Sequence, residues 1–588
     1  MRNSRWWVLA ILLCVGSVEA EAKEYADRWF YVSFGIGSDA DAEQVCTLLK
    51  TAGENGLNGM LWACPWERVA NWSDVSKGRL AKIRQAADDA GVEIIPILWS
   101  VGYGTMLWKD NNLVEGAKVS DLPFLVTGKR AVFHPEMPGN RVKNGGFEES
   151  KNHRFADYDF NDMPGVISFA DTEVKHGGAA SLRMEGFTAD KHGHGRITQR
   201  FAVHPNRRYV LSVWYKTEGL DMDGKLRFQI HRKDTSQILT SVSPLLLESR
   251  DRKPGATKWR SWDVHTKNGF YSREVRSQEA SDGWKQARIF FQTGAEDTEL
   301  RLYLGIWGGN KGKFWLDDLD LREVGMSSPL NRPGTPMTVK NARTGQVYDE
   351  GKDFTRPDFT LSLWKEAEAD CTLGIPDTSA IPDGTELLVS YYQPLRTERG
   401  QLSVCMSEPA LYDAFEESAR DIQEILAPKK WFLSMDEIRA GGSCQACKKR
   451  GLTLGEILGD CITKQYEIIQ RVHPKAEVYL WSDMLDPMHN CHADYYACDG
   501  DFTGVCDHIP RQLIISCWYF KIREESMKYF SEKGFRTQAA AYYDKDDAPN
   551  WNGWLETCDR TPGCVGIMYT TWRKKYDLLV PFAKALNP

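Results

Sequence analysis

This sequence lacks low-complexity runs, an excess of positive charge and a second long apolar segment. Without low-complexity runs, and with 11% aromatic residues, the chain is not expected to be disordered in bulk. Acidic residues (81) outnumber basic ones (74), so we expect no basic surface and predict no nucleic-acid partner. After the N-terminus no segment reads as a membrane helix, so we predict no membrane insertion.

The composition is otherwise that of a soluble globular protein. The chain has 588 residues, of which 26% are charged and 42% hydrophobic. At roughly 150 residues per domain this is about three to four domain-equivalents, or fewer if one is a large barrel. Tryptophan is abundant, with 21 residues. Indole rings stack on the apolar faces of sugars, so this count favours carbohydrate handling, although a large Trp-rich core is the alternative.

The first 20 residues have the features of a signal peptide. Arg2 and Arg5 precede an apolar run over 8–16, and Val18 and Ala20 are small residues at the positions that precede cleavage. The apolar run is too short to span a membrane. We therefore expect cleavage near Ala20 and a secreted or periplasmic protein.

Ten of the 14 cysteines follow position 400. Removal of a signal peptide would leave 13, an odd number, so at least one thiol is expected to be unpaired or intermolecular. Cys444 and Cys447 form a single CxxC motif. A lone CxxC is a weak zinc signal, and the thioredoxin-like context of a redox motif is missing. We favour a disulfide there, local or to a distant cysteine.

Alternating strand and helix patterns at both ends of the chain predict a barrel. Eight continuous apolar strands are expected at 29–35, 59–63, 93–99, 430–437, 477–483, 513–520, 536–544 and 564–572. Amphipathic helices are expected between them, for example at 41–56, 76–91, 409–427 and 454–473. Eight such strands fit an α/β fold, a (β/α)₈ TIM barrel interrupted after its third strand. A doubly wound sheet is the alternative.

The interruption has the pattern of an antiparallel β-sandwich of jelly-roll type. Short alternating strands separated by turn residues are expected at 208–217, 225–232, 285–293, 299–307 and 313–324. We predict a signal peptide over 1–20, the first part of the barrel over 21–139, the inserted sandwich over 140–325, a linker with irregular strands over 326–385, and the second part of the barrel over 386–588.

Acidic and aromatic residues gather at the carboxyl ends of the predicted barrel strands, where barrels of this kind place their active sites. Together they would form a sugar-binding cup, although any single aromatic residue has barrel packing as its alternative. The predicted cup residues are Trp99, Trp481, Asp483, Trp518, Tyr542, Tyr543, Asp544, Tyr569 and Trp572.

Asp436 and Glu437 are the predicted catalytic residues. Adjacent carboxylates repel, which raises the pKa of one of them, as a general acid requires. Neighbouring strand residues point to opposite faces, so they do not flank a bond as the two acids of an ordinary retaining glycosidase do. The pair suits a division of roles in which one acid protonates the leaving oxygen and the other holds a substrate group that attacks in place of an enzyme nucleophile. A solvated loop pair is the alternative.

A second polar cluster follows the strand at 477–483. Asp483, Asp486, His489 and Asn490 are predicted to contact sugar hydroxyls. Asp486 stands before a proline and suits a turn instead. A zinc site that uses the nearby histidines and cysteines is a further alternative, but the ligand spacing is irregular.

The stretch 405–450 resembles glycoside hydrolase family 20, the β-N-acetylhexosaminidases. That family has a strand that ends in His-x-Gly-Gly-Asp-Glu, and this chain has Phe432-Leu433-Ser434-Met435-Asp436-Glu437. The resemblance implies that Asp436 orients the 2-acetamido group and that Glu437 is the acid/base. It also implies a sugar-binding role for Arg28. The family's histidine is missing here, and so is its usual N-terminal domain.

The predicted sandwich resembles the jelly-roll carbohydrate-binding modules of secreted glycosidases. It opens with NGGFEE at 144–149 and closes with FWLDDLDLREV at 314–324. The resemblance implies a structural calcium held near Glu148 and Asp318, since calcium takes oxygen ligands. A purely structural domain is the alternative. We expect no cofactor for catalysis.

These observations predict an exported glycoside hydrolase that removes a 2-acetamido sugar, GlcNAc or GalNAc, from a glycan by a retaining, substrate-assisted mechanism. Two rivals remain. One is a glycosidase of another substrate class in which Asp483 is nucleophile or base beside Glu437. The other is a non-catalytic glycan-binding protein. The oligomeric state does not follow from the sequence.

Overall fold

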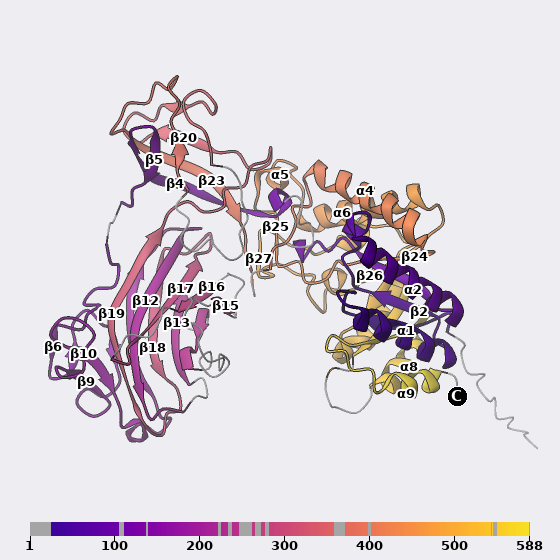
Figure 1. The fold of residues 1–588 in the computed structure, drawn as a ribbon, viewed down its shortest axis with the longest axis horizontal. Coiled ribbons are helices and arrows are strands. Elements are labelled where there is room, and N and C mark those ends of the chain that lie inside the picture. The colour runs from indigo at the N-terminus through magenta and orange to yellow at the C-terminus, as the bar shows by residue number, and fades with distance from the viewer. Residues whose placement is uncertain are drawn as a thin grey trace, which may run out of the picture.

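The structure is a computed structural model. It describes residues 25–104, 111–136, 139–221, 225–232, 238–245, 261–264, 272–276, 282–357, 371–397, 401–542, 544 and 550–586. The predicted signal peptide and Tyr543 lie outside the described residues. Figure 1 shows a barrel with its helices on one side of the molecule and antiparallel sheets on the other.

Eight parallel strands form a closed barrel in which every strand pairs with the next and the last pairs with the first. Ring closure brings Trp29 of the first strand opposite Met568 of the last. Each segment predicted as a barrel strand overlaps one of these strands, and the closed ring excludes the doubly wound alternative. In order around the barrel they are β1 (Asp27–Val32), β2 (Gly59–Trp62), β3 (Glu93–Leu98), β24 (Lys430–Leu433), β26 (Glu477–Trp481), β28 (Ile514–Cys517), β29 (Arg536–Tyr542) and β30 (Cys564–Thr570).

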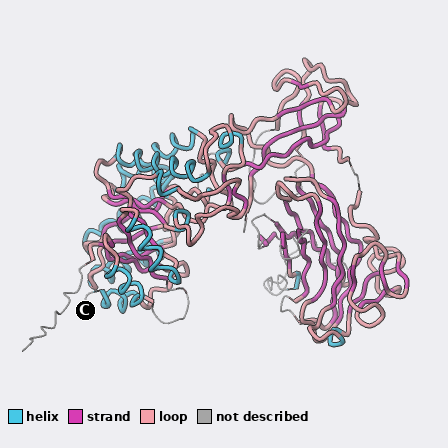
Figure 2. Tube along the Cα trace, turned by 180° about the vertical axis from the view of Figure 1, so that it is seen from behind, coloured by secondary structure: helices cyan, strands magenta, loops and turns pink. Residues whose placement is uncertain are grey.

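Helices cover the outside of the barrel, as Figure 2 shows in cyan. Two of them begin at capping boxes, in which Ser38 and Asp41, and likewise Thr453 and Glu456, satisfy each other's backbone N–H groups. The helices are α1 (Asp39–Glu54), α2 (Asp74–Ala90), α4 (Pro409–Leu426), α5 (Gln445–Lys448), α6 (Leu454–Val472), α7 (Arg523–Glu532), α8 (Trp551–Arg560) and α9 (Leu579–Leu586). One apolar core lies between strands and helices, and a smaller one that includes Trp29, Phe432 and Tyr479 fills the barrel interior.

Two antiparallel sheets share a third core, which is lined by residues of both. They follow β3 and precede β24 in the sequence. The seven-stranded sheet runs β15 (Ser261–Val264), β16 (Ser272–Arg276), β17 (Lys285–Gln292), β12 (Arg208–Glu218), β19 (Lys313–Val324), β10 (Ser181–Met184) and β9 (Ser168–Asp171). The five-stranded sheet runs β14 (Ile238–Val242), β13 (Leu226–Arg232), β18 (Glu299–Ile306), β11 (Gly195–Ala202) and β8 (Phe160–Asn161). The mixed α/β class with a closed parallel barrel and antiparallel sheets is thus confirmed.

A six-stranded antiparallel sheet with its own core was not expected. Its longest strand, β4, lies within 21–139, the range predicted as the first part of the barrel. Pro123 lies inside β4, where proline normally argues against a paired strand, and a bulge interrupts the pairing with β23. The sheet runs β21 (Val347–Tyr348), β20 (Thr338–Asn341), β23 (Glu386–Pro394), β4 (Gly116–Thr127), β5 (Arg130–Phe133) and β22 (Leu373–Gly374).

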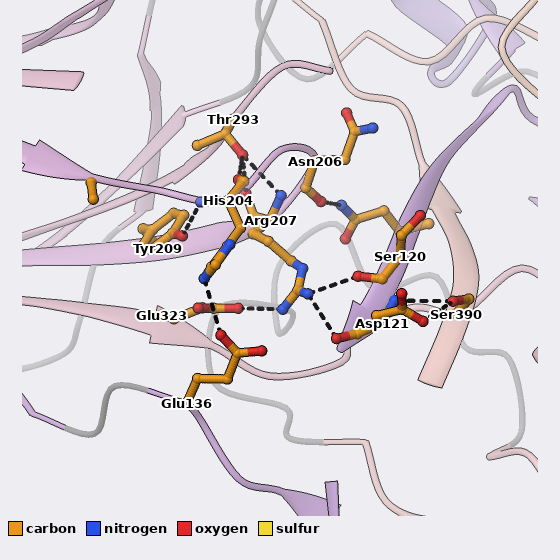
Figure 3. A network of polar contacts seen from close by, with 12 residues as sticks. Ser120, Asp121, Glu136, His204, Asn206, Arg207, Tyr209, Thr293, Glu323 and Ser390 are labelled. Atoms are coloured by element: carbon orange, nitrogen blue, oxygen red, sulfur yellow. Dashed lines mark hydrogen bonds and ion pairs between the residues drawn. The ribbon is translucent and has the colours of Figure 1, made fainter. Parts of the chain in front are cut away.

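Arg207 joins the six-stranded sheet to the seven-stranded one (Figure 3). Its guanidinium forms an ion pair with Glu323 of β19, with Nη1 2.7 Å from Oε1. Its Nη2 donates to the carbonyl oxygens of Ser120 (2.7 Å) and Asp121 (3.1 Å) in β4. Because both charged side chains are buried, this contact fixes the two sheets against each other.

Two short pairings complete the described sheets. β25 (Ala440–Gly441) pairs in parallel with β27 (Ala497–Cys498), and β6 (Ser150–Lys151) pairs antiparallel with β7 (Arg154–Phe155). Among the described residues, none of the helices combines the length and apolar character needed to cross a membrane.

Candidate active site

Asp436 and Glu437 follow β24 at the carboxyl end of the barrel. Oγ of Ser434 donates to Oδ1 of Asp436 at 2.7 Å. Glu437 has a φ of 48°, in the left-handed region that a non-glycine residue rarely adopts. Gly102 makes room for this turn, since a Cβ there would lie 2.4 Å from the carbonyl oxygen of Asp436 and 2.8 Å from that of Glu437. Strained backbone of this kind is common at functional sites.

Three residues that sequence patterns did not single out hold Glu437. The hydroxyl of Tyr103 donates to its Oε2, and Arg439 Nη2 lies 3.0 Å from its Oε1. Gln401 binds the same unit, because its Nε2 donates to the carbonyl oxygens of Glu437 (2.9 Å) and Gly102 (2.8 Å) and its Oε1 accepts from Arg439. Tyr103 and Gln401 lie outside predicted strand ends, so only Arg439, two residues after Glu437, was near any sequence signal.

Asp483 begins a short turn after β26 and is fully buried. Its Oδ2 accepts from the backbone N–H of Glu437 (2.8 Å) and from Asn490 Nδ2 (2.8 Å). Its Oδ1 accepts from the indole N–H of Trp518 at 3.2 Å. Both oxygens are therefore occupied by donors, and Asp483 positions the residues around it.

Burial makes this site electrostatically unusual. It raises the pKa of Asp436 to about 7, with repulsion from Asp483 and Glu437 as further causes. Burial also raises the pKa of Asp483 to about 6, although the hydrogen bonds that it accepts from Glu437, Asn490 and Trp518 oppose the shift. The carboxyl groups at this end of the barrel thus share one low-dielectric region.

Several aromatic rings lie at the same end of the barrel, and one of them, Trp518, contacts Asp483. The His489 ring lies 4.5 Å from that of Trp518 and stacks on Tyr519 at 4.9 Å. Burial lowers the pKa of His489, and its Nδ1 has no hydrogen-bond partner among the described residues. Trp572 is 52% exposed and meets the buried ring of Tyr31 edge-on at 4.8 Å.

Trp481 and the tyrosines are placed differently. Trp481 is buried in the barrel interior against Phe432, with ring centroids 4.7 Å apart. Tyr569 points to the helix layer, where its hydroxyl donates to the carbonyl oxygen of Lys575 at 2.6 Å. Tyr542 ends β29, and its side chain is outside what the structure describes.

Trp99, Asp486 and Asp544 are also engaged in the protein. Trp99 packs outward on α4, where its indole N–H donates to Ser418 Oγ at 2.7 Å. Asp486 accepts from Ser526 Oγ and from the backbone N–H of Met488 (2.9 Å), as a turn residue would. Asp544 accepts from the backbone N–H of Trp572 at 2.8 Å and so anchors the loop that carries this ring.

Arg28 lies at the start of β1, at the amino ends of the barrel strands. Asp436 and Glu437 follow the other end of the ring of parallel strands. The Arg28 guanidinium donates to the carbonyl oxygens of Gly56 (2.8 Å) and Tyr25. The structure therefore does not bring Arg28 to the other predicted site residues.

Glu148 and Asp318 come together at the loop 176–179. Glu148 Oε2 accepts from the backbone N–H of Ala179 at 2.8 Å, and Asp318 Oδ2 lies 2.6 Å from His176 Nδ1. The two carboxylates occupy the space beside consecutive glycines, Gly177 and Gly178. The calcium remains a prediction at this loop.

Comparisons with known proteins return only distant likenesses. No family model matches the chain, and no curated protein matches it. Among solved structures, a β-N-acetylhexosaminidase is 13% identical with a TM-score of 0.24, and the match covers 33% of this chain and 44% of that one. A β-N-acetylhexosaminidase from Bacteroides fragilis NCTC 9343 is 11% identical with a TM-score of 0.23, over 32% of this chain and 42% of that one. The carbohydrate-binding module TmCBM61, in complex with β-1,4-galactotriose, is 14% identical with a TM-score of 0.19, over 31% and 98%.

The chain thus spans less than half the length of these two hexosaminidases. At such TM-scores the likenesses carry no weight for the site. What the site can do follows from its own groups: three carboxyls, two of them with raised pKa values, an arginine, a tyrosine hydroxyl and a set of aromatic rings.

Proposed function

We propose that this protein is an exported glycoside hydrolase that removes a 2-acetamido sugar from a glycan with retention of configuration. Its architecture is an interrupted (β/α)₈ TIM barrel with an inserted sandwich of carbohydrate-binding-module type. The hexosaminidases and binding modules among the solved structures are consistent with this substrate class, but the proposal does not rest on them. The observation that carries the proposal is the Asp436–Glu437 pair, built into a strained turn at the carboxyl end of the barrel.

In the proposed reaction Glu437 donates its proton to the glycosidic oxygen while the C1–O bond to the leaving group breaks. The carbonyl oxygen of the substrate's own 2-acetamido group forms the new bond to C1 and closes an oxazoline-type ring. Asp436 accepts a hydrogen bond from the acetamido N–H. Glu437 then takes a proton from water, whose oxygen attacks C1 and reopens the ring, so that the product keeps the original anomeric configuration.

Asp483 acts as a positioning residue in this proposal. A nucleophilic carboxylate needs a free oxygen that faces C1, but both oxygens of Asp483 accept hydrogen bonds from Glu437, Asn490 and Trp518. The rival in which Asp483 forms a covalent bond to the sugar would require these bonds to break, at a cost of about 1–3 kcal/mol for each buried donor left unsatisfied.

The proposed substrate contacts are the exposed ring of Trp572, the half-buried ring of Trp518 and the free Nδ1 of His489. A ring that is partly exposed and rigidly held offers a flat face to an apolar sugar surface. A buried nitrogen without a protein partner can be satisfied by a substrate hydroxyl.

The test is a panel of aryl β-glycosides with and without a 2-acetamido group. We expect only the 2-acetamido substrates to turn over, with the retained anomer as first product in an NMR time course. Glu437→Gln and Asp436→Asn should each lower kcat/KM by about 10²–10⁴-fold. Glu477→Gln is the matched control, because Glu477 begins the next barrel strand at the opposite end and pairs with Arg536 on the surface.

Other outcomes would favour the rivals. If plain hexosides are cleaved and Asp436→Asn hardly changes kcat/KM, the substrate-assisted mechanism is contradicted. Binding of 2-acetamido glycans by calorimetry without turnover of a natural-glycan panel, unchanged in Glu437→Gln, would indicate a glycan-binding protein.

A further inference from the structure

A buried cluster of three thiols and one carboxylate lies beside the barrel. Ligand atoms of Glu115, Cys405, Cys444 and Cys447 all lie within 4.8 Å of one another, and the four residues are at most 1% exposed. Glu115 precedes β4, Cys405 precedes α4, Cys444 is the N-cap of α5, and Cys447 lies within α5. Side chains from three separate segments therefore converge on one point.

The spacing within the cluster suits a single metal ion. The Sγ atom of Cys405 lies 3.1 Å from that of Cys444 and 3.7 Å from that of Cys447, and the last two are 3.7 Å apart. Thiolates at about 2.3 Å from a tetrahedral ion lie about 3.8 Å from each other. Both separations that involve Cys447 match this value, and the separation between Cys405 and Cys444 is shorter. A disulfide would join only two of the three sulfurs and leave the third thiol buried beside a carboxylate.

Glu115 is oriented as a metal ligand. Its Oε1 accepts from the backbone N–H of Cys444 (2.7 Å) and from Ser443 Oγ (2.9 Å). Its Oε2 is left facing the sulfurs, 3.8 Å from Cys447 Sγ. Hydrogen bonds that hold one carboxylate oxygen while the other points to the ion are typical of outer-shell support in metal sites.

A cation lies close enough to offset the negative charge of such a set. Arg332 interacts electrostatically with Cys405, Cys444 and Glu115, and its guanidinium is held in place by Glu408 and by the carbonyl oxygen of Val114 (2.8 Å). Its side chain is only 4% exposed. A buried arginine beside two of the thiols and the carboxylate would offset part of the negative charge that the four ligands carry when they bind a cation.

We propose that Glu115, Cys405, Cys444 and Cys447 bind a structural Zn²⁺ ion. Soft thiolates in a closed four-ligand tetrahedron select zinc over hard cations, and the set leaves no position open for substrate or water. On binding, the thiols that still carry protons release them to solvent, and no electron is transferred.

The ion would connect the places where the chain leaves and re-enters the barrel. The two segments already pair through the backbone, since Cys405 N donates to Leu113 O (2.7 Å) and Glu115 N to Ser403 O (2.8 Å). Gln401, just before this pairing, binds the carbonyl oxygen of Glu437. Zinc would therefore hold the segment that supports Glu437, whatever reaction the barrel catalyses.

The test is metal analysis of the full chain purified from zinc-supplemented medium without chelators. We expect about one zinc per chain by plasma mass spectrometry, and near-zero zinc in Cys444→Ser and Glu115→Gln. Cys461→Ser is the matched control, because Cys461 is an equally buried cysteine in α6 outside the cluster, and it should keep the metal.

Two measurements on the unaltered protein keep the test decisive if the variants do not fold. Removal of zinc by a chelator should lower Tm by more than about 5 °C, and re-addition should restore it. Cobalt exchange should produce the thiolate charge-transfer and d–d bands of a tetrahedral site. A mass lower by two hydrogens together with a Cys405–Cys444 or Cys444–Cys447 linked peptide would overturn the proposal in favour of a disulfide. Free thiols without metal, or zinc retained in Cys444→Ser, would overturn it as well.

Discussion

The backbone N–H of Glu437 donates a 2.8 Å hydrogen bond to Oδ2 of Asp483, across the gap between two neighbouring barrel strands. Glu437 adopts a left-handed φ of 48°, which this bond helps to maintain. The backbone of the proposed acid Glu437 is thus held in position by a second, buried acid, Asp483.

Asp483→Asn should lower kcat/KM by about 10–100-fold on whichever substrate the enzyme cleaves. Three donors point at the two oxygens of Asp483, and an amide presents an acceptor to only one side, so a buried donor loses its partner. Steady-state kinetics of the folded variant would measure this. Asp507→Asn, at an exposed acid paired with Lys533, is the control.

A different result would identify Asp483 as a nucleophile. In that case a small variant such as Asp483→Gly would lose nearly all activity, and added azide would restore turnover and yield a glycosyl azide. Absence of azide rescue is expected, because both oxygens of Asp483 accept hydrogen bonds from other residues and neither is free to attack C1.

The pH dependence of kcat/KM should show an acid limb close to pH 7. Burial raises the pKa of Asp436 to about 7, and the proposed role requires the ionised form. Activity should therefore rise with pH up to about 7, as the free enzyme loses this proton. A fall in activity above pH 7 whose midpoint shifts in the Asp436→Glu variant would instead make Asp436 the proton donor.

The same group should make stability depend on pH. The folded pKa of Asp436 lies above the ordinary value of about 3.9, so the folded state keeps a proton that the unfolded state has lost. Unfolding free energy should therefore fall as pH rises from about 4 to 7, and stay lower above that. Asp436→Asn should be more stable than wild type at pH 8 by about 1–3 kcal/mol, and equal to it near pH 4, in urea titrations.

Gly102→Ala should destabilise the protein by about 1–3 kcal/mol and lower kcat/KM by at least about tenfold. The new Cβ would lie under 3.0 Å from backbone oxygens of Asp436 and Glu437, which have no side-chain freedom with which to yield. Gly78→Ala in α2 meets no atom within 4 Å and should stabilise by about 0.5–1 kcal/mol. Equal behaviour of the two variants in thermal melts and kinetics would contradict the close approach at Gly102.

Arg207→Ala should cost about 2–4 kcal/mol while leaving kcat/KM nearly unchanged. Glu323 keeps its second partner Arg141, at 3.0 Å, but two carbonyl oxygens of β4 lose their donor. Urea denaturation followed by tryptophan fluorescence would measure the loss. Arg322→Ala is the control, because Arg322 is 61% exposed and its pair with Asp320 is screened by water.

Local sequence patterns were sufficient for the barrel strands and for the acidic pair. Continuous apolar runs of five to nine residues bounded by capping residues and glycines predict buried parallel strands, and all eight appear. The position of Asp436 and Glu437 after a barrel strand could be predicted because the end of a strand is a local property, and their catalytic role stays a prediction. The six-stranded sheet was missed because Pro123 and the bulge in β4 break the local alternation, and because β23, one of the two strands that pair with β4, lies more than 200 residues away in the chain.

The sequence by itself determined which segments form the strands of the barrel and which acids follow β24, because periodicity and capping act within a few residues. Only the tertiary structure decided which side chains meet. Trp99, Tyr569 and Arg28 share strand-end or motif signals with the site, yet packing directs the first two into the helix layer and leaves the third at the opposite end of the barrel. Tyr103, Gln401 and Arg439 carry no such signal, and long-range contacts bring them to Glu437. Contacts between residues hundreds of positions apart depend on the whole fold, and no short window of sequence contains them.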